Sequence, residues 1–394
     1  MNQEKLSANI WKLYLIKGLR SFMLAIPIIV LFFQENGLSM QQVFLLQALF
    51  SVAVISLEVP TGYFSDIFGR KKSIIIGGIL ATTGFAIYSQ AYTFWGFLLA
   101  EITLGFGISF ISGADSAMLY DTLLEKGREL EYQKREGRGL SIGMLSESLA
   151  SVLGGLLALI SLRFPLYCDA AVTFLIIPVA LTLVEPKIQR AKKTESSLKG
   201  MWRLIKFSLH DHKEIKWLII YSASVAASTF TMFWFIQPYL LATKVPLGFF
   251  GVILAGLLLT AAFFSWNAHK IEKILGKKNS LILLIVLPAL GYLLLSSLWF
   301  VWSGVFILFF YIVRGMNNPI TLDYINGLIP SDIRATVLSV KNLVGRVMFS
   351  VIGPLVGWMS DVFSLKAALL SSGATFLVLG LISLAFMYKH KALE

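Results

Sequence analysis

Charged side chains interrupt long apolar stretches of this chain at positions where they could bind a proton, an ion or a substrate. An ionisable group inside such a stretch is costly in a membrane, so it normally faces the protein interior and pairs with another group. Most of these groups fall in the amino-terminal half. The candidates for coupling or for lining a cavity are Arg20, Glu58, Glu101, Asp115, Glu147, Arg314 and Asp323.

The fourth apolar stretch carries a regular pattern of polar and small residues. Gly105, Ser112 and Asp115 follow Glu101 at offsets of 4, 11 and 14 residues. At about 100° per residue, a continuous helix would place all of them within roughly 40° of one line. We expect this face to line a cavity, with Ser112 contacting substrate. The alternative is packing of small residues against another helix, with Glu101 near the outer headgroups.

Arg20 lies about nine residues, or roughly 14 Å, into the first apolar stretch, too deep to reach the surface comfortably. It therefore needs an anion, and Asp115 or Glu58 has a compatible depth, whereas Lys17 could extend to the surface. Glu147 is either a buried proton-binding carboxyl or a structural partner of Arg20 or Lys341. Asp169 is expected at a solvated helix start.

Aromatic residues gather in the seventh apolar stretch. They could line a substrate site with a glutamine as hydrogen-bond partner. The substrate-lining candidates are Phe230, Phe233, Trp234 and Gln237. Contact with lipid explains the aromatic residues equally well, because such side chains are common near membrane interfaces.

Composition indicates that these residues are positioned by membrane-spanning helices. Of 394 residues, 57% are hydrophobic and 14% are charged, against roughly 25% charged in soluble domains. A span needs about 20 mainly apolar residues. The apolar runs predict twelve helices, at 10–33, 41–64, 73–91, 95–120, 139–161, 164–184, 216–241, 247–268, 279–298, 301–324, 334–357 and 366–388, with an outer turn at 296–303.

Lysine and arginine concentrate in every second loop, which predicts that both termini are cytoplasmic. The net charge of +12 then belongs to cytoplasmic loops and lipid headgroups rather than to a nucleic-acid site. The hydrophilic linker 185–215 separates an amino-terminal six-helix bundle, 1–184, from a carboxy-terminal one, 216–394. Around 198–209 the linker could form an amphipathic helix on the membrane surface or remain a solvated connection.

The two predicted bundles resemble each other weakly in sequence. SVLGGLLA at 151–158 matches SVIGPLVG at 350–357, and FGRKKSIII at 68–76 matches LGKKNSLIL at 275–283. Repeated bundles with a substrate site between them are a recurrent architecture of secondary transporters.

A charged motif lies between the second and third predicted helices. Gly69 permits a positive φ at a tight turn, and the cations from Arg70 onward favour the cytoplasm. Asp66 must pair with these cations or lie at the amino terminus of another helix. The motif consists of Gly62, Asp66, Gly69, Arg70 and Lys71.

These residues, in a chain with twelve predicted spans and a central linker, resemble the loop motif of the major facilitator superfamily, G-x-x-x-D-x-x-G-R-K. The resemblance covers essentially the whole chain. It implies two pseudo-symmetric six-helix bundles that rock about a cavity, with this loop as a cytoplasmic latch. It also implies that Gly62 allows approach to the eleventh helix, that Asp66 faces the start of that helix near 334–336, and that Arg70 pairs with Asp121.

Two departures concern the type of transport. Glu101 stands where many proton-coupled members have arginine, and the fifth helix lacks the full glycine-proline motif of drug antiporters. SGADSAMLYD at 112–121 and IPSDIRATVLS at 329–339 look like segments of a bacterial efflux or permease subgroup.

The sequence thus predicts a monomeric secondary transporter in the bacterial inner membrane, moving a small molecule by alternating access with protons as coupling ion. Efflux is slightly favoured, and import of a nutrient or a siderophore-like metal chelate is the alternative. We expect no cofactor, metal site, nucleic-acid partner or catalytic residue, since no phosphate-binding loop occurs and all four histidines fall outside the predicted spans. A receptor or an intramembrane enzyme would leave the repeat and the motif unexplained.

Overall fold

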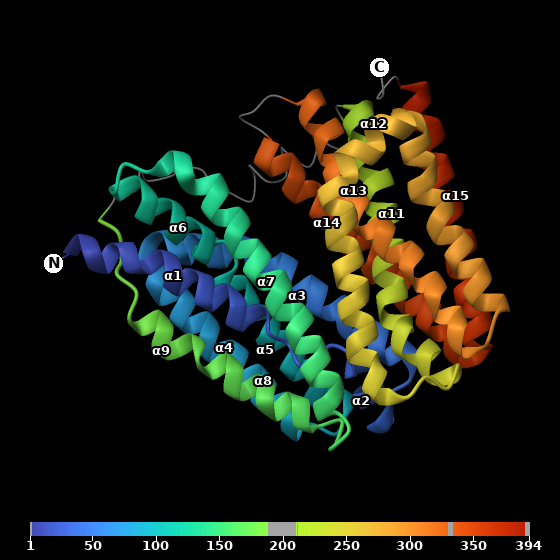
Figure 1. Ribbon diagram of the computed structural model, residues 1–394, viewed down its shortest axis with the longest axis horizontal. Coiled ribbons are helices and arrows are strands. Elements are labelled where there is room, and N and C mark those ends of the chain that lie inside the picture. The colour runs from blue at the N-terminus through green and yellow to red at the C-terminus, as the bar shows by residue number, and fades with distance from the viewer. Residues whose placement is uncertain (1, 188–209, 211, 330–333, 391–394) are drawn as a thin grey trace. The chain divides into compact units, whose positions relative to one another are not determined.

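Helices make up all the regular structure of the described chain. The computed structural model describes residues 2–187, 210, 212–329 and 334–390 (Figure 1). The predicted all-α class is confirmed. The elements are α1 (Asn2–Ser21), α2 (Ile29–Glu35), α3 (Met40–Phe68), α4 (Arg70–Gln90), α5 (Phe94–Ile111), α6 (Ala114–Glu125), η1 (Glu129–Glu131), α7 (Tyr132–Leu157), α8 (Phe164–Phe174), α9 (Ile176–Leu181), α11 (Lys213–Ala242), η3 (Leu247–Phe249), α12 (Phe250–Ser297), η4 (Val301–Ile307), α13 (Leu308–Leu328), α14 (Arg334–Val362) and α15 (Leu365–Lys389).

Ten helical segments of the described residues are long and apolar enough to cross a membrane. Two features reconcile this count with twelve predicted spans. The first predicted span is divided between α1 and α2, and α12 contains two predicted spans that meet at Gly276, where φ is 77°. The predicted outer turn is present between the end of α12 and η4. The amphipathic helix predicted at 198–209 lies outside the described residues.

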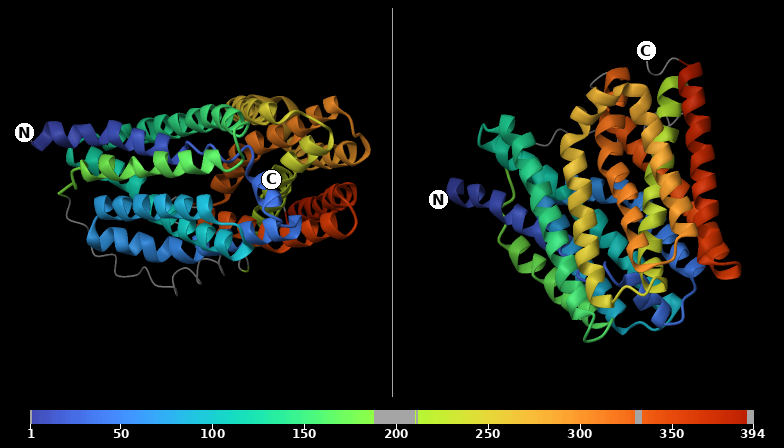
Figure 2. Two further views of the ribbon diagram at one scale, coloured as in Figure 1. Left: turned by 90° about the horizontal axis from the view of Figure 1, so that it is seen from below. Right: turned by 45° about the vertical axis from the view of Figure 1, so that its right-hand side comes forward.

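The chain forms two compact units. Unit 1 comprises Met1–Leu38, Leu49–Thr194 and Leu247–Ala255, and unit 2 comprises Ser39–Ala48, Glu195–Pro246 and Gly256–Glu394. In unit 1, α1 packs against α6, α7 and α9, while α4 packs against α5 and α8 (Figure 1). In unit 2, α11 packs against α13, α14 and α15 (Figure 2). The predicted domain boundaries near 184 and 216 stay a prediction.

The first span is broken rather than continuous. Between α1 and α2, the Asp169 carboxylate of α8 accepts the backbone N–H of Leu24 at 2.7 Å and that of Ala25 at 3.0 Å. Asp169 is fully buried, so its predicted solvated position is wrong. A broken helix frees backbone N–H groups that must find acceptors inside a membrane protein, and Asp169 supplies them. A Cβ on Gly154 would lie 1.8 Å from the Leu24 carbonyl oxygen, so α7 requires glycine beside the break.

The fourth span is also broken. The α5 helix ends at Ile111 and α6 begins at Ala114, with Gly113 at φ 83° and ψ −41° between them. The predicted single stripe from Glu101 to Asp115 is therefore wrong, because it assumed an uninterrupted helix. Glu101 is buried beside the Tyr88 hydroxyl, and a Cβ on Gly105 would lie 3.5 Å from Ala53. Packing thus accounts for the first half of this pattern.

The matching segments 151–158 and 350–357 have the same packing role, each within its own unit. In unit 1, a Cβ on Gly251 at the start of α12 would lie 2.0 Å from the Ser151 carbonyl oxygen. In unit 2, a Cβ on Gly357 would lie 2.8 Å from the Cα of Gln41 at the start of α3. Small residues permit such close approach of helices. The repeated sequence therefore marks where each unit receives the first turns of a helix.

The start of α3 is also capped by a carboxylate of α14. Asp361 accepts the backbone N–H of Met40 at 2.9 Å and that of Gln41 at 2.8 Å. A negative charge is favourable at a helix amino terminus, where the first N–H groups lack partners within the helix. Unlike Asp169, Asp361 is exposed.

Candidate functional site

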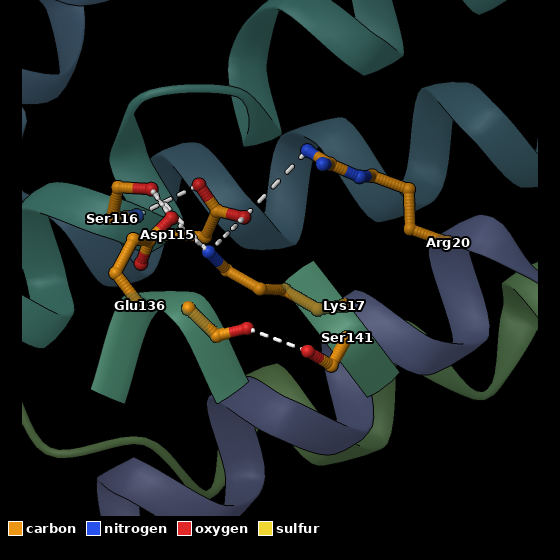
Figure 3. A network of polar contacts seen from close by, with 7 residues as sticks. Lys17, Arg20, Asp115, Ser116, Glu136 and Ser141 are labelled. Carbon is orange, nitrogen blue, oxygen red and sulfur yellow. Dashed lines mark hydrogen bonds and ion pairs between the residues drawn. The ribbon is translucent and has the colours of Figure 1, made fainter. Parts of the chain in front are cut away.

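A cluster of two cations and two carboxylates lies inside unit 1 (Figure 3). The Lys17 ammonium of α1 forms an ion pair with Glu136 of α7 and lies 3.9 Å from the Asp115 carboxylate of α6. The side chains of Lys17 and Asp115 are only 5% and 3% exposed. The expectation that Lys17 extends to the surface is therefore wrong: two nearby anions hold its ammonium in the interior.

Arg20 approaches the same carboxylate from one turn further along α1. Its Nη1 lies 3.6 Å from Asp115 Oδ2, so the predicted Arg20 and Asp115 contact is present. This nitrogen is buried and donates no hydrogen bond within the described residues. Asp115 is thus shared between two cations, as Figure 3 shows by the two side chains pointing toward it.

Local backbone geometry places the carboxylates of the cluster. The break at Gly113 starts a new helix, and Asp115 lies in the first turn of α6, where a negative charge is stabilised. Its Oδ1 accepts the backbone N–H of Ser116 at 2.7 Å. The Ser116 hydroxyl donates to Glu136 at 2.8 Å. Tyr132, also on α7, contacts this serine. The helix break therefore brings the two carboxylates to one ammonium.

Glu136 was missing from the predicted site. The hydrophilic run between Lys126 and Arg138 indicated a loop, whereas α7 begins at Tyr132 and takes Glu136 into its first turns. Charge balance was the available signal: two deep cations in the first span require two carboxylates, and with Glu58 exposed in the structure the second has to come from elsewhere.

The other coupling candidates lie elsewhere. Glu58 on α3 is exposed, and none of the ion pairs of the described chain includes it. Glu147 is half-buried on α7, one turn from Gly143, whose added Cβ would lie 3.0 Å from Ser21 Oγ. Arg314 and Asp323 are exposed positions on α13. Their predicted roles stay predictions.

The charged motif forms a compact arrangement at the end of α3. Arg70 forms an ion pair with Asp66, donates to Ser65 Oγ at 3.1 Å, and has its Nε 3.6 Å from Asp121. The predicted contacts of Arg70 with both acids are therefore present. Gly69 has φ 105°, as the turn was expected to require.

Two expectations about the motif concern the eleventh span. A Cβ on Gly62 would meet no atom of unit 1 within 4 Å among the described residues, so nothing inside that unit requires glycine there. The side chains of 334–336 lie outside the described part of the chain. The predicted contacts of Gly62 and Asp66 with that span stay predictions, as does the latch role of Lys71.

Glu185 supplies the cap that Gly69 cannot. Its two carboxylate oxygens accept the backbone N–H groups of Arg70 and Lys71, each at 2.8 Å. A Cβ on Gly69 would lie 3.0 Å from Glu185 Oε1. Sequence reasoning assigned Glu185 to the linker. The signal for it was a helix start that offers no serine, threonine, aspartate or asparagine at its own cap position.

We expect Glu185→Gln to lower the free energy of unfolding by about 1 kcal/mol, since an amide nitrogen would face one of the two N–H donors and the charge at the helix start would be lost. Reversible unfolding of the purified protein in detergent measures this. Glu129→Gln, at an exposed position of η1, removes the same charge without a cap. Equal stability of the two variants would contradict the capping role.

The aromatic residues of α11 form a second group, in unit 2. Phe230 and Phe233 are stacked with centroids 6.0 Å apart, and Trp234 packs edge-on against both. Both phenylalanines are half-buried, while Trp234 and Gln237 are buried at 4% exposure each. Only the phenylalanines are thus accessible among the predicted lining residues of this helix.

Helices broken within the membrane-spanning part and charges paired inside a bundle define a class of protein, the polytopic transporters. A family model described as Major Facilitator Superfamily matches residues 13–354. The chain belongs to this superfamily, whose members are secondary transporters of small molecules.

Relatives and solved structures agree with this assignment. The MFS-type transporter YxaM of Bacillus subtilis is 23% identical over 390 residues, covering 96% of each chain. An MFS-type transporter of Methanocaldococcus jannaschii is 20% identical over 275 residues, 70% of each chain. A structure of the nucleoside transporter NupG superposes with a TM-score of 0.78 at 15% identity over 99% of both chains. An inward-facing bacterial homologue of the lysosomal transporter Spinster gives 0.75 at 17% identity, covering 98% of this chain and 97% of that one. The predicted major facilitator fold is confirmed.

Proposed function

We propose that this transporter works by alternating access driven by the proton gradient, with the cluster of Lys17, Arg20, Asp115 and Glu136 as its coupling site. The observation that carries the proposal is the sharing of Asp115 between two cations inside unit 1. Ionised, the four side chains balance in charge. Each added proton raises the net charge of the cluster by one.

This imbalance is what would couple protonation to conformation. An excess charge is costly away from water, so a protonated cluster favours the conformation in which water or a substrate anion reaches it. A proton can shift the equilibrium only through such a difference between two states. The break at Gly113 supports the assignment, because discontinuous helices commonly form the ion and substrate sites of transporters.

The charged motif is proposed as the gate on the cytoplasmic side. Arg70 joins Asp66 at the end of α3 to Asp121 at the end of α6, and the predicted contact of Asp66 with the start of α14 would close the latch. We place the monomer in the bacterial inner membrane with both termini in the cytoplasm, on the alternation of basic loops.

Export is the proposed direction, on the likeness of 112–121 and 329–339 to efflux-type members of the superfamily. Import of a nutrient or a metal chelate is the alternative. The similar structures include a nucleoside transporter and a POT family transporter with 5-aminolevulinic acid. These cargoes differ on one fold, and fold alone does not fix a substrate, so neither is assigned to this chain.

Coupling can be tested in proteoliposomes loaded with the pH indicator pyranine. Addition of a transported compound from a panel of small organic anions, cations and neutral molecules should change the internal pH of vesicles that hold the wild-type protein. Glu136→Gln should reduce this proton movement at least tenfold and retain exchange of the labelled compound across the membrane. Glu131→Gln should behave as wild type, since Glu131 pairs with Arg128 and Arg135 outside the cluster.

Glu147, on the same helix, is the competing candidate for the coupling carboxyl, and Glu147→Gln tests it. If that variant loses proton movement and Glu136→Gln retains it, the cluster is not the coupling site. Exchange that does not saturate with substrate concentration would argue against alternating access itself.

A further inference from the structure

Two cations in the spans of unit 2, Arg314 and Lys341, lack the compensation by carboxylates found in unit 1. Seven ion pairs, among them those of Lys17, Arg20 and Arg70, lie in unit 1. In unit 2, Arg314 of α13 takes part in none of them. Lys341 of α14 donates to the neutral side chain of Asn318 at 2.7 Å. Two cations in the spans of one unit thus have no carboxylate within ion-pair distance in the described chain.

Arg314 lies in the middle of its span. The membrane-crossing segment Val301–Leu328 has 28 residues, and Arg314 is close to halfway along it, about 20 Å from either end at 1.5 Å per residue. Its side chain is nevertheless exposed. An exposed guanidinium at this depth is strongly disfavoured against lipid. Its exposed face must therefore border water.

Two aromatic rings, the half-buried Phe233 and the buried Tyr311, lie beside this cation. The Arg314 guanidinium lies 5.8 Å from the centroid of Phe233 and 5.6 Å from that of Tyr311, within the range of cation–π contacts. Along α11 from Tyr221 to Leu240, only Ala226, Phe230 and Phe233 are not buried. The accessible stripe of α11 thus leads to the cation of α13.

Two further polar groups adjoin these rings. The Trp234 Nε1–H is buried and has no acceptor within the described residues, and its ring packs against both phenylalanines. Asn318, which holds the Lys341 ammonium, is also exposed and follows Arg314 by four residues, so both lie on one face of α13. A ligand with an anionic group and an apolar body could pair with the exposed guanidinium and pack against the half-buried phenylalanine rings.

We propose that Arg314, with Phe233 and Tyr311 around it and with Asn318, the partner of Lys341, one turn away on α13, forms a binding subsite for an organic anion that carries an aromatic or apolar body. This inference rests on the proposed transport function and names its substrate class. The guanidinium neutralises the carboxylate, sulfonate or phosphate of the ligand, and the half-buried rings of Phe230 and Phe233 pack against the body. Such a ligand supplies the negative charge that unit 2 itself does not place beside Arg314.

The electrostatic part can be tested without knowing the substrate. Cys168 is the single cysteine, so Cys168→Ser/Phe230→Cys carries one thiol beside the subsite. Its reaction rate is measured with two methanethiosulfonate reagents, one bearing a sulfonate and one a trimethylammonium group, each relative to its rate with a free thiol. The sulfonate reagent should be favoured about tenfold, since a unit charge at this range acts oppositely on the two reagents.

Variants identify the source of the preference. Arg314→Gln should abolish it and Arg314→Lys should retain most of it. Lys366→Gln, which removes a cation lying over the Trp299 ring, should leave it unchanged. If the Phe230→Cys protein does not fold, Ala226→Cys on the same stripe takes its place. Reaction with neither reagent, preference for the cation, or no effect of Arg314→Gln would each overturn the proposal.

Transport distinguishes failure of this inference from failure of the proposed function. Anionic members of the panel should be moved by wild type and lose at least tenfold in apparent affinity with Arg314→Gln. Movement of cations alone would contradict the proposed anion subsite but would be consistent with the proposed transport function. An anion-selective thiol reaction without any gradient-dependent flux would support the subsite and count against proton-driven transport.

Discussion

Replacing Asp169 by leucine is expected to lower the free energy of unfolding by about 4 kcal/mol, because the two buried N–H groups of Leu24 and Ala25 would lose their acceptors. Leucine has a similar shape and no oxygen. Asp169→Asn keeps one acceptor and should cost about half as much. Reversible unfolding in detergent or bicelles measures each value.

Asp361 offers a matched control for this prediction. It accepts two consecutive backbone N–H groups in the same way, at the start of α3, and it is exposed. Water can replace it there, so Asp361→Ala should cost only about 1 kcal/mol, as for an ordinary helix cap. If the variants at Asp169 and Asp361 are equally stable, the break between α1 and α2 does not depend on a buried acceptor.

The second large effect is expected from Asp115→Asn. Lys17 would then keep only Glu136, Arg20 would lose its ion pair, and buried positive charge would be left without full compensation. Removing one partner of a buried ion pair typically costs about 3 kcal/mol or more. The measurement is again the free energy of unfolding, with Glu131→Gln as the control for loss of a carboxylate from exposed ion pairs.

A double variant separates charge imbalance from loss of packing. Arg20→Gln/Asp115→Asn removes one cation and one anion together and should recover a substantial part of the lost stability, so the two single effects would not add. Additive losses would mean that Asp115 acts through its hydrogen bond to Ser116 rather than through its charge.

Much of the fold could be predicted from the sequence, because apolar runs of sufficient length have few alternatives to spanning helices. The breaks were not predicted. Pro27 lacks a backbone N–H and gave one local signal, but residues 22–28 continue the apolar run of the first span, and the carboxylate that accepts the freed N–H groups comes from α8. Likewise, the predicted stripe of residues from Glu101 to Asp115 was wrong beyond Gly113. The positive φ of that residue ends the helix, so the 100° spacing per residue no longer applies.

The candidate site was predicted where partners lie in recognisable patterns. Arg70 with its two acids follows from the motif, whereas depth in the spans left Asp115 or Glu58 as the partner of Arg20, and the structure has Asp115. Glu136 and Glu185 were missed because each stands in a hydrophilic run that indicated a loop or a linker. Hydropathy reports whether a segment prefers water. It does not report which distant backbone or ammonium a carboxylate will meet.

The cap at the start of α3 has a consequence for biosynthesis. Met40 and Gln41 donate their backbone N–H groups to Asp361, a residue 321 positions later than the first of them. At about 5–20 residues per second, a ribosome needs roughly 16 to 64 s to make that stretch. During this interval the backbone N–H groups of Met40 and Gln41 must donate to water or lipid headgroups instead. This is possible because the position is exposed. An early helix of this chain is therefore completed by one of the last, and final assembly must follow the synthesis of α14.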